Sequence, residues 1–386
     1  MQTAEDDFDR RLFSMLGGPM HRLGMRLGLV RGHSGTVRLG LALAFLLWGV
    51  SVLLAWSLGV DLLSFNMLGA HVRLLVVIPL LFVAESMLDP RMDGFVRVVI
   101  RARVVPGASR ERLLAELDRI ARWKDLWWPE VLCAALAIAF LWLTPLMHIP
   151  GADTTLQTNH PAQVAAAGWW YSIVCLTVLR FLLLRWIWHL LLWIYCLWFI
   201  SRLPLRLVPA HSDGMAGLGG LEMVQVHFAP LILAVSAALA ASFAVDIHSG
   251  AMPLEAVYPA IAAILLVDAL LVIGPLLLFT QPLWACKVRG IGEYMMLAEK
   301  YSARFEKKWL GRSTPDEELL GSGDIQSLAD LTTAIGVVRA VRVVPISTGV
   351  LINLAIVALL PMIPLMLFKY PMAELIGQML GRLTGM

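Results

Sequence analysis

Charged side chains are scarce in this sequence. Asp, Glu, Lys and Arg make up 15% of the 386 residues, and apolar residues make up 59%. A soluble domain has roughly 25% charged and 45–50% apolar residues. The apolar excess is gathered in blocks of about 20 residues, the length that a helix needs to cross a hydrocarbon core of ~30 Å. The composition therefore excludes a large separate soluble domain and predicts a single polytopic membrane domain over residues 1–386.

Cysteines and catalytic motifs are also sparse. The four cysteines are Cys133, Cys175, Cys196 and Cys286. They lie within apolar blocks or at their ends, and no pair has metal-ligand spacing, so we interpret them as small buried apolar residues. The sequence contains no GxSxG elbow, no haem-attachment motif and no Walker lysine. These absences make an enzyme the less favoured expectation.

Lys and Arg are missing from three connections between the apolar blocks, 59–71, 148–167 and 247–256. Cytoplasmic loops retain these residues, and short translocated loops lack them. The asymmetry predicts a cytoplasmic N-terminus and a C-terminus on the opposite side of the membrane. Residues 1–37 show no cleavable signal, so we expect the first span to be retained. The seven predicted spans are 38–58, 72–89, 130–147, 168–200, 228–247, 257–281 and 347–368.

The expected fold is an all-α bundle of about seven transmembrane helices. Two helical segments, 90–129 and 282–346, are predicted to form a small cytoplasmic layer. The fourth span, 168–200, would be ~50 Å long as one helix, so it must tilt strongly or project from the bilayer. Residues 372–385 place their apolar side chains on one side, which predicts a C-terminal amphipathic helix.

Four ionisable side chains stand out inside the predicted spans, where a charge is costly unless it faces protein or water. They are Glu85 in the second span, Arg180 and Arg185 in the fourth, and Asp268 in the sixth. These three spans run in the same direction, so membrane depth predicts two ion pairs, Arg180 with Asp268 and Arg185 with Glu85. Two interpretations stay open: pairs that only join the helices, and a polar pathway for an ion or solute.

The connection between the fourth and fifth spans, residues 209–227, is rich in glycine and reads PAHSDGMAGLGGLEMVQVH. Its glycines permit positive φ and close backbone approach; those of interest are Gly217, Gly219 and Gly220. One interpretation is a tight turn in which Asp213 caps backbone amides and His211 bonds a carbonyl.

Two other interpretations of this connection involve a ligand. His211, Asp213 and His227 have the donor atoms of a divalent metal site for zinc, manganese or iron, although their spacing matches no standard motif. Alternatively, the N-terminus of the helix that follows the glycines holds an anion or a lipid headgroup. All three interpretations stay open at this point.

Three stretches of the chain are distinctive as motifs: AESMLDPR at 84–91, PAHSDGMAGLGGL at 209–221 and EELLGSGDIQSLADL at 317–331. Together they resemble an uncharacterised family of bacterial polytopic inner-membrane proteins that has a His-x-Asp-Gly…Gly-Gly-Leu motif. Ser212 stands where that family usually has Pro. The resemblance covers most of the chain and implies a bacterial inner membrane, in which the distribution of Lys and Arg predicts a periplasmic C-terminus. It singles out His211, Asp213 and Asp324 but implies no substrate.

Our leading functional hypothesis is a membrane protein that passes or senses a small ion or solute through a polar core lined by Glu85, Arg180, Arg185 and Asp268. The first alternative is a metal-dependent membrane enzyme that uses the 209–227 region. The second is a non-catalytic membrane scaffold. Membrane lipid is the expected partner, nucleic acid is not expected, and a homo-oligomer stays open.

Overall fold

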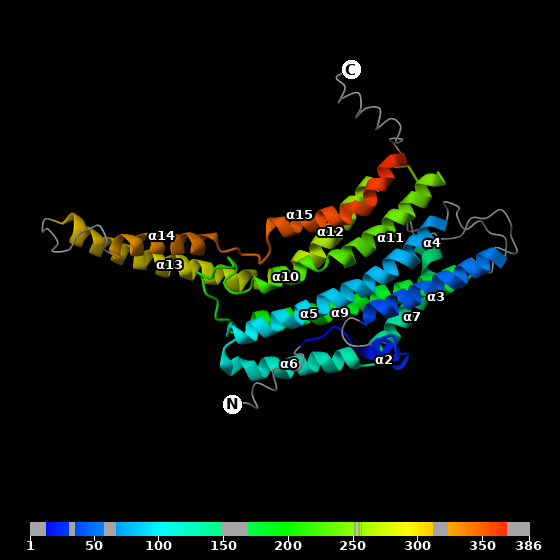
Figure 1. The fold of residues 1–386 in the computed structure, drawn as a ribbon, viewed down its shortest axis with the longest axis horizontal. Coiled ribbons are helices and arrows are strands. Elements are labelled where there is room, and N and C mark those ends of the chain that lie inside the picture. The colour runs from blue at the N-terminus through cyan, green and yellow to red at the C-terminus, as the bar shows by residue number, and fades with distance from the viewer. Residues whose placement is uncertain are drawn as a thin grey trace, which may run out of the picture.

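The computed structural model describes residues 13–30, 35–57, 67–147, 169–250, 252, 253, 255, 257–311 and 323–368. Within these ranges the regular structure is entirely helical, which confirms the expected all-α class. The helices run back and forth along one long axis (Figure 1). The amphipathic helix predicted over 372–385 lies outside the described residues.

Each predicted span is occupied by a helix. The helices are α3 (Thr36–Ser57), α4 (Leu68–Val72) with η2 (Arg73–Val77) and α5 (Ile78–Arg101), α7 (Trp128–Met147), η3 (Trp170–Cys175) with α9 (Leu176–Arg202), α11 (Ala229–His248), α12 (Val257–Ile273) with η5 (Gly274–Phe279), and α15 (Thr348–Leu359) with η7 (Leu360–Phe368). Six of these are long and apolar enough to cross a membrane, and α7 together with α6 (Gly107–Asp125), bent by 45°, brings the number to seven.

Several helices continue well beyond their apolar blocks. The second helix runs unbroken over Leu68–Arg101, whereas the fourth stays close to its apolar block, over Trp170–Arg202, as one helix of 33 residues. The sixth covers Val257–Leu310, 54 residues in all. A change from apolar to charged composition ends the membrane-embedded part without ending the helix, because Lys, Arg and Glu are good helix formers.

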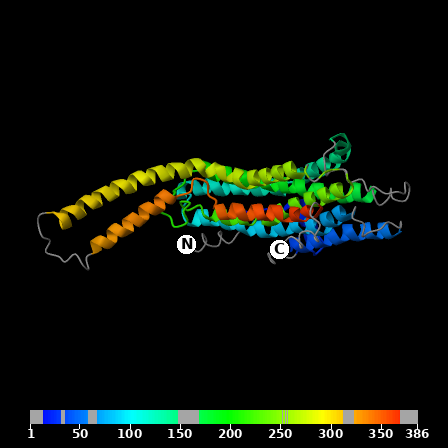
Figure 2. The same ribbon diagram turned by 90° about the horizontal axis from the view of Figure 1, so that it is seen from above.

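The charged ends of these helices build the predicted helical layer at one end of the bundle. There α13 (Thr280–Phe305), continued by η6 (Glu306–Leu310), and α14 (Gly323–Ala340) project together beyond the other helices (Figure 2). Asp324, expected to start a helix, ties the hairpin together near its tip. Its Oδ2 accepts from Lys308 Nζ at 2.9 Å and from Trp309 Nε1 at 3.0 Å.

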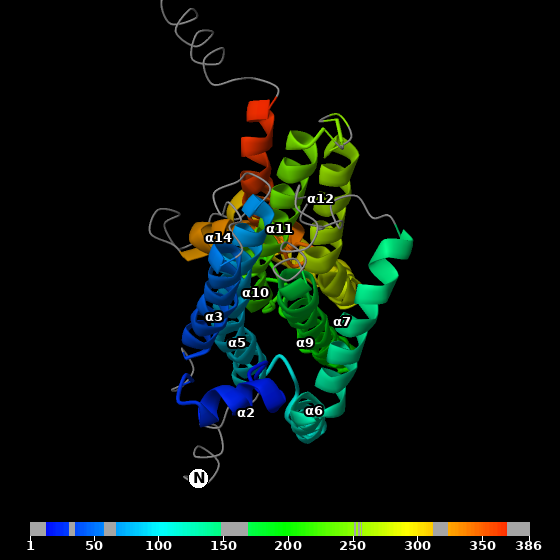
Figure 3. The same ribbon diagram turned by 90° about the vertical axis from the view of Figure 1, so that its right-hand side faces the viewer.

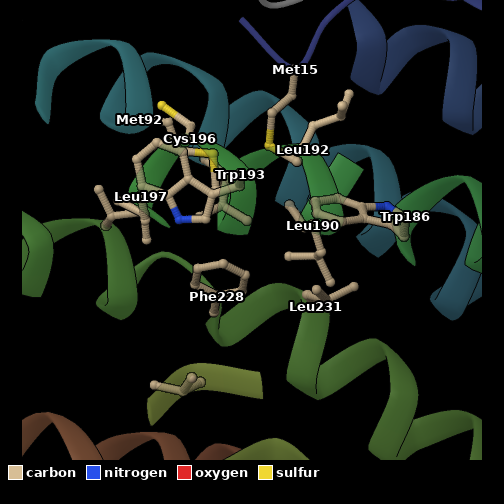
Figure 4. Packing of buried hydrophobic residues seen from close by; sticks show 14 of the residues in the cluster. Met15, Met92, Trp186, Leu190, Leu192, Trp193, Cys196, Leu197, Phe228 and Leu231 are labelled. Carbon is tan, nitrogen blue, oxygen red and sulfur yellow. The ribbon is translucent and has the colours of Figure 1, made fainter. Parts of the chain in front are cut away.

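The hydrophobic core joins α5, α9, α11 and the segment before α2 (Gly18–Arg26). Figure 4 shows Trp193 and Cys196 of α9 facing Met92 of α5, with Phe228 and Leu231 beneath them. Residues 13–17, called the strap here, enter this core without regular secondary structure. The ring of Phe13 stands edge-on to Trp193 at 5.1 Å between centroids, so the strap is part of the core.

The outer faces of the bundle carry large exposed apolar side chains. Trp142 on α7 is 79% exposed, and Leu266 on α12 is 70% exposed. Because such faces are unfavourable in water and favourable in hydrocarbon, they fit a helix bundle surrounded by lipid.

Candidate functional site

A buried ion pair joins α5 to α9. Arg185 Nη2 donates to Glu85 Oε1 at 2.8 Å, and Nη1 donates to Oε2 at 3.2 Å, so the guanidinium grips the carboxylate with two parallel bonds. Both side chains are almost fully buried. This contact confirms the predicted pairing of Arg185 with Glu85. A role in a pathway is a separate question.

A second carboxylate, which the sequence analysis did not single out, approaches the same guanidinium. Glu130 Oε1, on the first turn of α7, lies 3.5 Å from Arg185 Nε. The two charges are close, yet the Nε–H is not aligned for a hydrogen bond and remains unsatisfied. Arg185 and Glu130 therefore form an ion pair without a hydrogen bond, whereas Arg185 and Glu85 form an ion pair with two hydrogen bonds.

Glu130 also holds the beginning of α2. Its Oε2 accepts the backbone N–H of Met20 at 2.9 Å, and Asp125 Oδ1 accepts that of Gly18 at 3.1 Å. Carboxylates suit this position because the first N–H groups of a helix lack partners and carry its positive dipole end. Gly18 is needed there, since its φ is +84° and a Cβ would lie 2.2 Å from Glu130 Oε1.

Two histidines and a lysine surround these charges. His189 Nδ1, one turn along α9 from Arg185, lies 4.0 Å from Glu85 Oε1. His21 on α2 interacts electrostatically with Glu85, Arg185 and Lys124. Burial lowers the pKa of His21; Glu85 and Asp89 act to raise it, and Arg185 and Lys124 act to lower it further. The cluster thus spans α2, α5, α6, α7 and α9.

Two further acids of α5, Asp89 and Asp93, bind the strap through hydrogen bonds. Asp89 Oδ1 accepts from Ser14 Oγ at 2.7 Å and from the backbone N–H of Met15 at 2.6 Å. Asp93 Oδ1 accepts from the N–H of Phe13 at 3.1 Å. Buried backbone N–H groups outside a helix need hydrogen-bond acceptors. Asp89 and Asp93 supply these acceptors for the strap.

The second predicted pairing, Arg180 with Asp268, is wrong. Among the residues that the structure describes, Arg73 and Tyr171 act on Arg180, and Asp268 does not. Asp268 Oδ2 is buried and has no hydrogen-bond partner among the described residues. Equal depth in the membrane does not make two side chains neighbours, because α9 packs against η5 whereas α12 packs against α11 and α15.

The connection after α9 folds as a tight turn around one carboxylate. Asp213 accepts the backbone N–H groups of three residues: Met215 at 2.8 Å, Gly217 at 3.0 Å and Gly219 at 2.9 Å. Burial acts to raise the pKa of Asp213, but these amide donors, with a smaller contribution from His211, outweigh it and hold the pKa below its ordinary value. This confirms the capping role predicted for Asp213.

Two glycines of the turn have a structural reason, one for its backbone conformation and one for its close contact with α5. Gly217 has φ +99°, a conformation that side chains rarely adopt. A Cβ on Gly220 would lie 3.2 Å from the ring of Phe95, so α10 (Gly220–Val226) packs closely on α5. The ring of His211 contacts Asp213, with Nδ1 2.9 Å from Oδ1, rather than the carbonyl that we expected.

The proposed metal site does not form. No group of three or more His, Cys, Asp or Glu side chains converges at metal distance in the part of the chain that the structure describes. His227 lies apart from His211 and Asp213, with Nδ1 2.7 Å from the carbonyl of Met223 and Nε2 accepting from Arg91. Both carboxylate oxygens of Asp213 accept hydrogen bonds from backbone N–H groups, including that of Gly219 just before α10. Asp213 therefore occupies the helix N-terminus at which an external anion was proposed to bind.

The turn meets the projecting hairpin at a glycine, which yields a prediction with a matched control. A Cβ on Gly290 would lie 2.4 Å from Pro209 Cβ, whereas one on Gly292 meets nothing within 4 Å. We expect Gly290→Ala to destabilise the protein by about 1–3 kcal/mol through overpacking. Gly292→Ala is expected to stabilise it by roughly 0.5–1 kcal/mol, since Ala favours the helix. Thermal unfolding in detergent compares the two, and shifts of the same sign would contradict the contact.

The long apolar helices make the chain a multi-pass integral membrane protein. Comparison with protein-family models, curated proteins and solved structures finds no match for it. Its activity must therefore be argued from the charge cluster itself.

Proposed function

We propose that this protein senses a small cation, the proton, at the buried cluster of Glu85, Glu130 and Arg185. The observation that carries the proposal is that two carboxylates face one guanidinium, one of them with two hydrogen bonds and the other at 3.5 Å with an unaligned N–H. Two carboxylates thus share one guanidinium, and Glu130, the one without an aligned hydrogen bond to it, is only 12% exposed. Such a group gains a proton or an ion more readily than a solvated one.

The charges around the cluster bear on this balance. Lys124 from α6 and His189 from α9 face it, and His21 from α2 stands beside it. Asp89, one turn from Glu85 on α5, adds a negative charge that is already used by the strap. We infer that Glu130 is the group that gains the proton, because its ion pair with Arg185 has no hydrogen bond.

Protonation of Glu130 would be transmitted through its second oxygen. That oxygen holds the N–H of Met20, so a neutral Glu130 interacts less favourably with the start of α2. The expected result is a loosening of α2 relative to the α6–α7 bend when the cytoplasmic pH falls. A change in charge is thus converted into a change in the position of a surface helix.

Sensing is better supported than passage. Glu85 and Arg185 occupy each other with two bonds, and Asp268 is not among the charges that act on Arg185, Glu130 or His189. The four side chains proposed to line one pathway therefore do not act as one set.

The test uses a fluorescent label on α2. Leu27, at the C-terminal cap of α2, is exposed and can be replaced by Cys and labelled with an environment-sensitive dye, while the four native cysteines are buried. In lipid nanodiscs we expect the emission to change sigmoidally with pH, and Glu130→Gln to abolish the transition. Glu111→Gln, on the exposed side of α6, is the matched control and should leave the transition intact.

The outcomes separate the candidate functions. A flat emission in the unsubstituted protein, or a transition that survives Glu130→Gln, would contradict sensing. Proton flux into proteoliposomes that is lost in Glu85→Gln would favour passage instead. A scaffold predicts neither signal, and one observation favours it: Met296 and Leu310 are exposed on the projecting hairpin.

A further inference from the structure

The short helix α2 lies crosswise to the bundle. Figure 3, viewed along the long axis, shows α2 extended across the view beside α6, which is seen end-on. Gly24 lets α2 pack tightly, since a Cβ there would lie within 3.0 Å of both Val30 and Leu39. Together with the bonds from Asp125 and Glu130 at its first turn, this packing makes α2 a fixed part of the surface.

The position of α2 coincides with the boundary between charged and apolar chain. The charged helix α6 ends at Asp125, and the apolar helix α7 begins at Trp128. Trp127 and Trp128, at the bend between them, are both exposed. Exposed tryptophans at such a boundary are typical of the membrane interface, so α2 lies at the level of the lipid headgroups.

The exposed side of α2 combines two arginines with apolar side chains. A pocket of about 450 Å³ is lined by Pro19, Met20, Arg22, Leu23 and Arg26. Arg22 and Arg26 are four residues apart and therefore lie on the same side of the helix. Leu23 is 57% exposed between them, and Leu27 is also exposed one turn further on.

Among the described residues, no acidic side chain neutralises the charges of these arginines. Arg22 Nη2 donates to the backbone carbonyl of Asp125 at 3.1 Å, a contact that positions the guanidinium but carries no opposite charge. No carboxylate forms an ion pair with Arg22 or Arg26 among the residues that the structure describes. A pocket with two unneutralised guanidinium groups beside exposed leucines fits a ligand that is anionic at one end and apolar at the other.

We propose that the pocket on α2 binds the headgroup of an anionic phospholipid of the surrounding leaflet. Arg22 and Arg26 hold the phosphate, and Leu23 and Leu27 contact the upper part of the acyl chains. The membrane supplies this ligand at the level where α2 lies, and basic side chains near the inner leaflet attract such lipids. The observations behind this site, the pocket and its two arginines, are separate from those behind the proton-sensing role proposed for the charge cluster.

The experiment measures lipid binding to the full chain. The purified protein is placed in phosphatidylcholine nanodiscs with increasing phosphatidylglycerol, and bound lipids are counted by native mass spectrometry after release. We expect Arg22→Gln with Arg26→Gln to weaken the tightest phosphatidylglycerol site by about 30-fold. The matched control is Arg112→Gln with Arg304→Gln, which removes two exposed arginines from α6 and α13, outside the pocket.

Three results would overturn the proposal. The first is an equal loss of binding in the control double variant, because the attraction would then follow net charge alone. The second is unchanged binding in the Arg22/Arg26 double variant with a native thermal midpoint. The third is displacement of the lipid by millimolar inorganic phosphate, which would identify a free anion as the ligand. A Leu23→Gln variant tests the apolar half and should weaken phosphatidylglycerol while leaving the weak binding of phosphate unchanged.

Discussion

Replacing Arg185 with Met is expected to remove most of the folded protein. The substitution leaves Glu85 buried without its only two-bonded partner, and breaking one side of a buried ion pair destabilises a protein by about 3–5 kcal/mol. That is a large share of a total stability of about 5–15 kcal/mol. The measurement is the fraction of detergent-solubilised protein that elutes as a single species, together with its thermal midpoint. Arg289→Met is the control, since its ion pair with Glu293 spans 3.9 Å and both side chains are more than half exposed.

The double variant Arg185→Met with Glu85→Met distinguishes a structural pair from general damage. It removes both charges of the two-bonded pair, and Glu130, although it loses Arg185, keeps its bond from the N–H of Met20. We expect the double variant to recover most of the stability that the single variant loses, since apolar replacement of a buried pair is often neutral. A double variant as unstable as the single one would show that the contact contributes less than its geometry indicates.

The second large effect is expected for Asp213→Ala, which deprives three backbone N–H groups of their acceptor. Because the site is partly open to water, we expect a loss of about 2–3 kcal/mol at neutral pH rather than the full cost of three buried donors. The pKa of Asp213 is lowered on folding, so its stabilisation is present above the unfolded pKa of about 3.9 and is lost as the pH falls through the folded value.

The difference in thermal midpoint between the native chain and Asp213→Ala should therefore shrink below about pH 4. Asp118→Ala, an exposed acid on α6, is the control and should leave the midpoint unchanged at both pH values. A difference that stays constant as the pH falls would mean that the carboxylate charge is not what holds the turn.

The sequence predicted the elements well where one local property was enough. Apolar block length located each span, and the glycines with Asp213 indicated a turn closed by a carboxylate. The pairing of Arg185 with Glu85 also followed from depth, because α5 and α9 happen to meet there. The charged ends of α5 and α13 are equally regular helices, as their composition of good helix formers allows.

The rest depends on which helices are lateral neighbours, and depth along a helix carries no information about that. Arg180 and Asp268 are at similar depth but belong to helices that pack on different partners. The buried Arg73 of η2 is met by Tyr171 and by Ser242 of α11, which no spacing in the sequence relates to it. An acid in the first turn of an apolar helix, such as Glu130, could have indicated a buried charge, but Glu130 also marks the first residue of the third predicted span.

The long sixth helix has a mechanical consequence. It changes to a 3₁₀ segment at Gly274–Phe279, next to α9, and then continues straight into the projecting hairpin. Short 3₁₀ segments inside helices often mark hinges. From Phe279 to Leu310 the arm is roughly 45 Å long, so a rotation of about 5° at the hinge displaces its far end by about 4 Å. A pivot within the apolar part of the helix thus converts an ångström-scale shift among packed side chains into a larger movement at the far end of the arm.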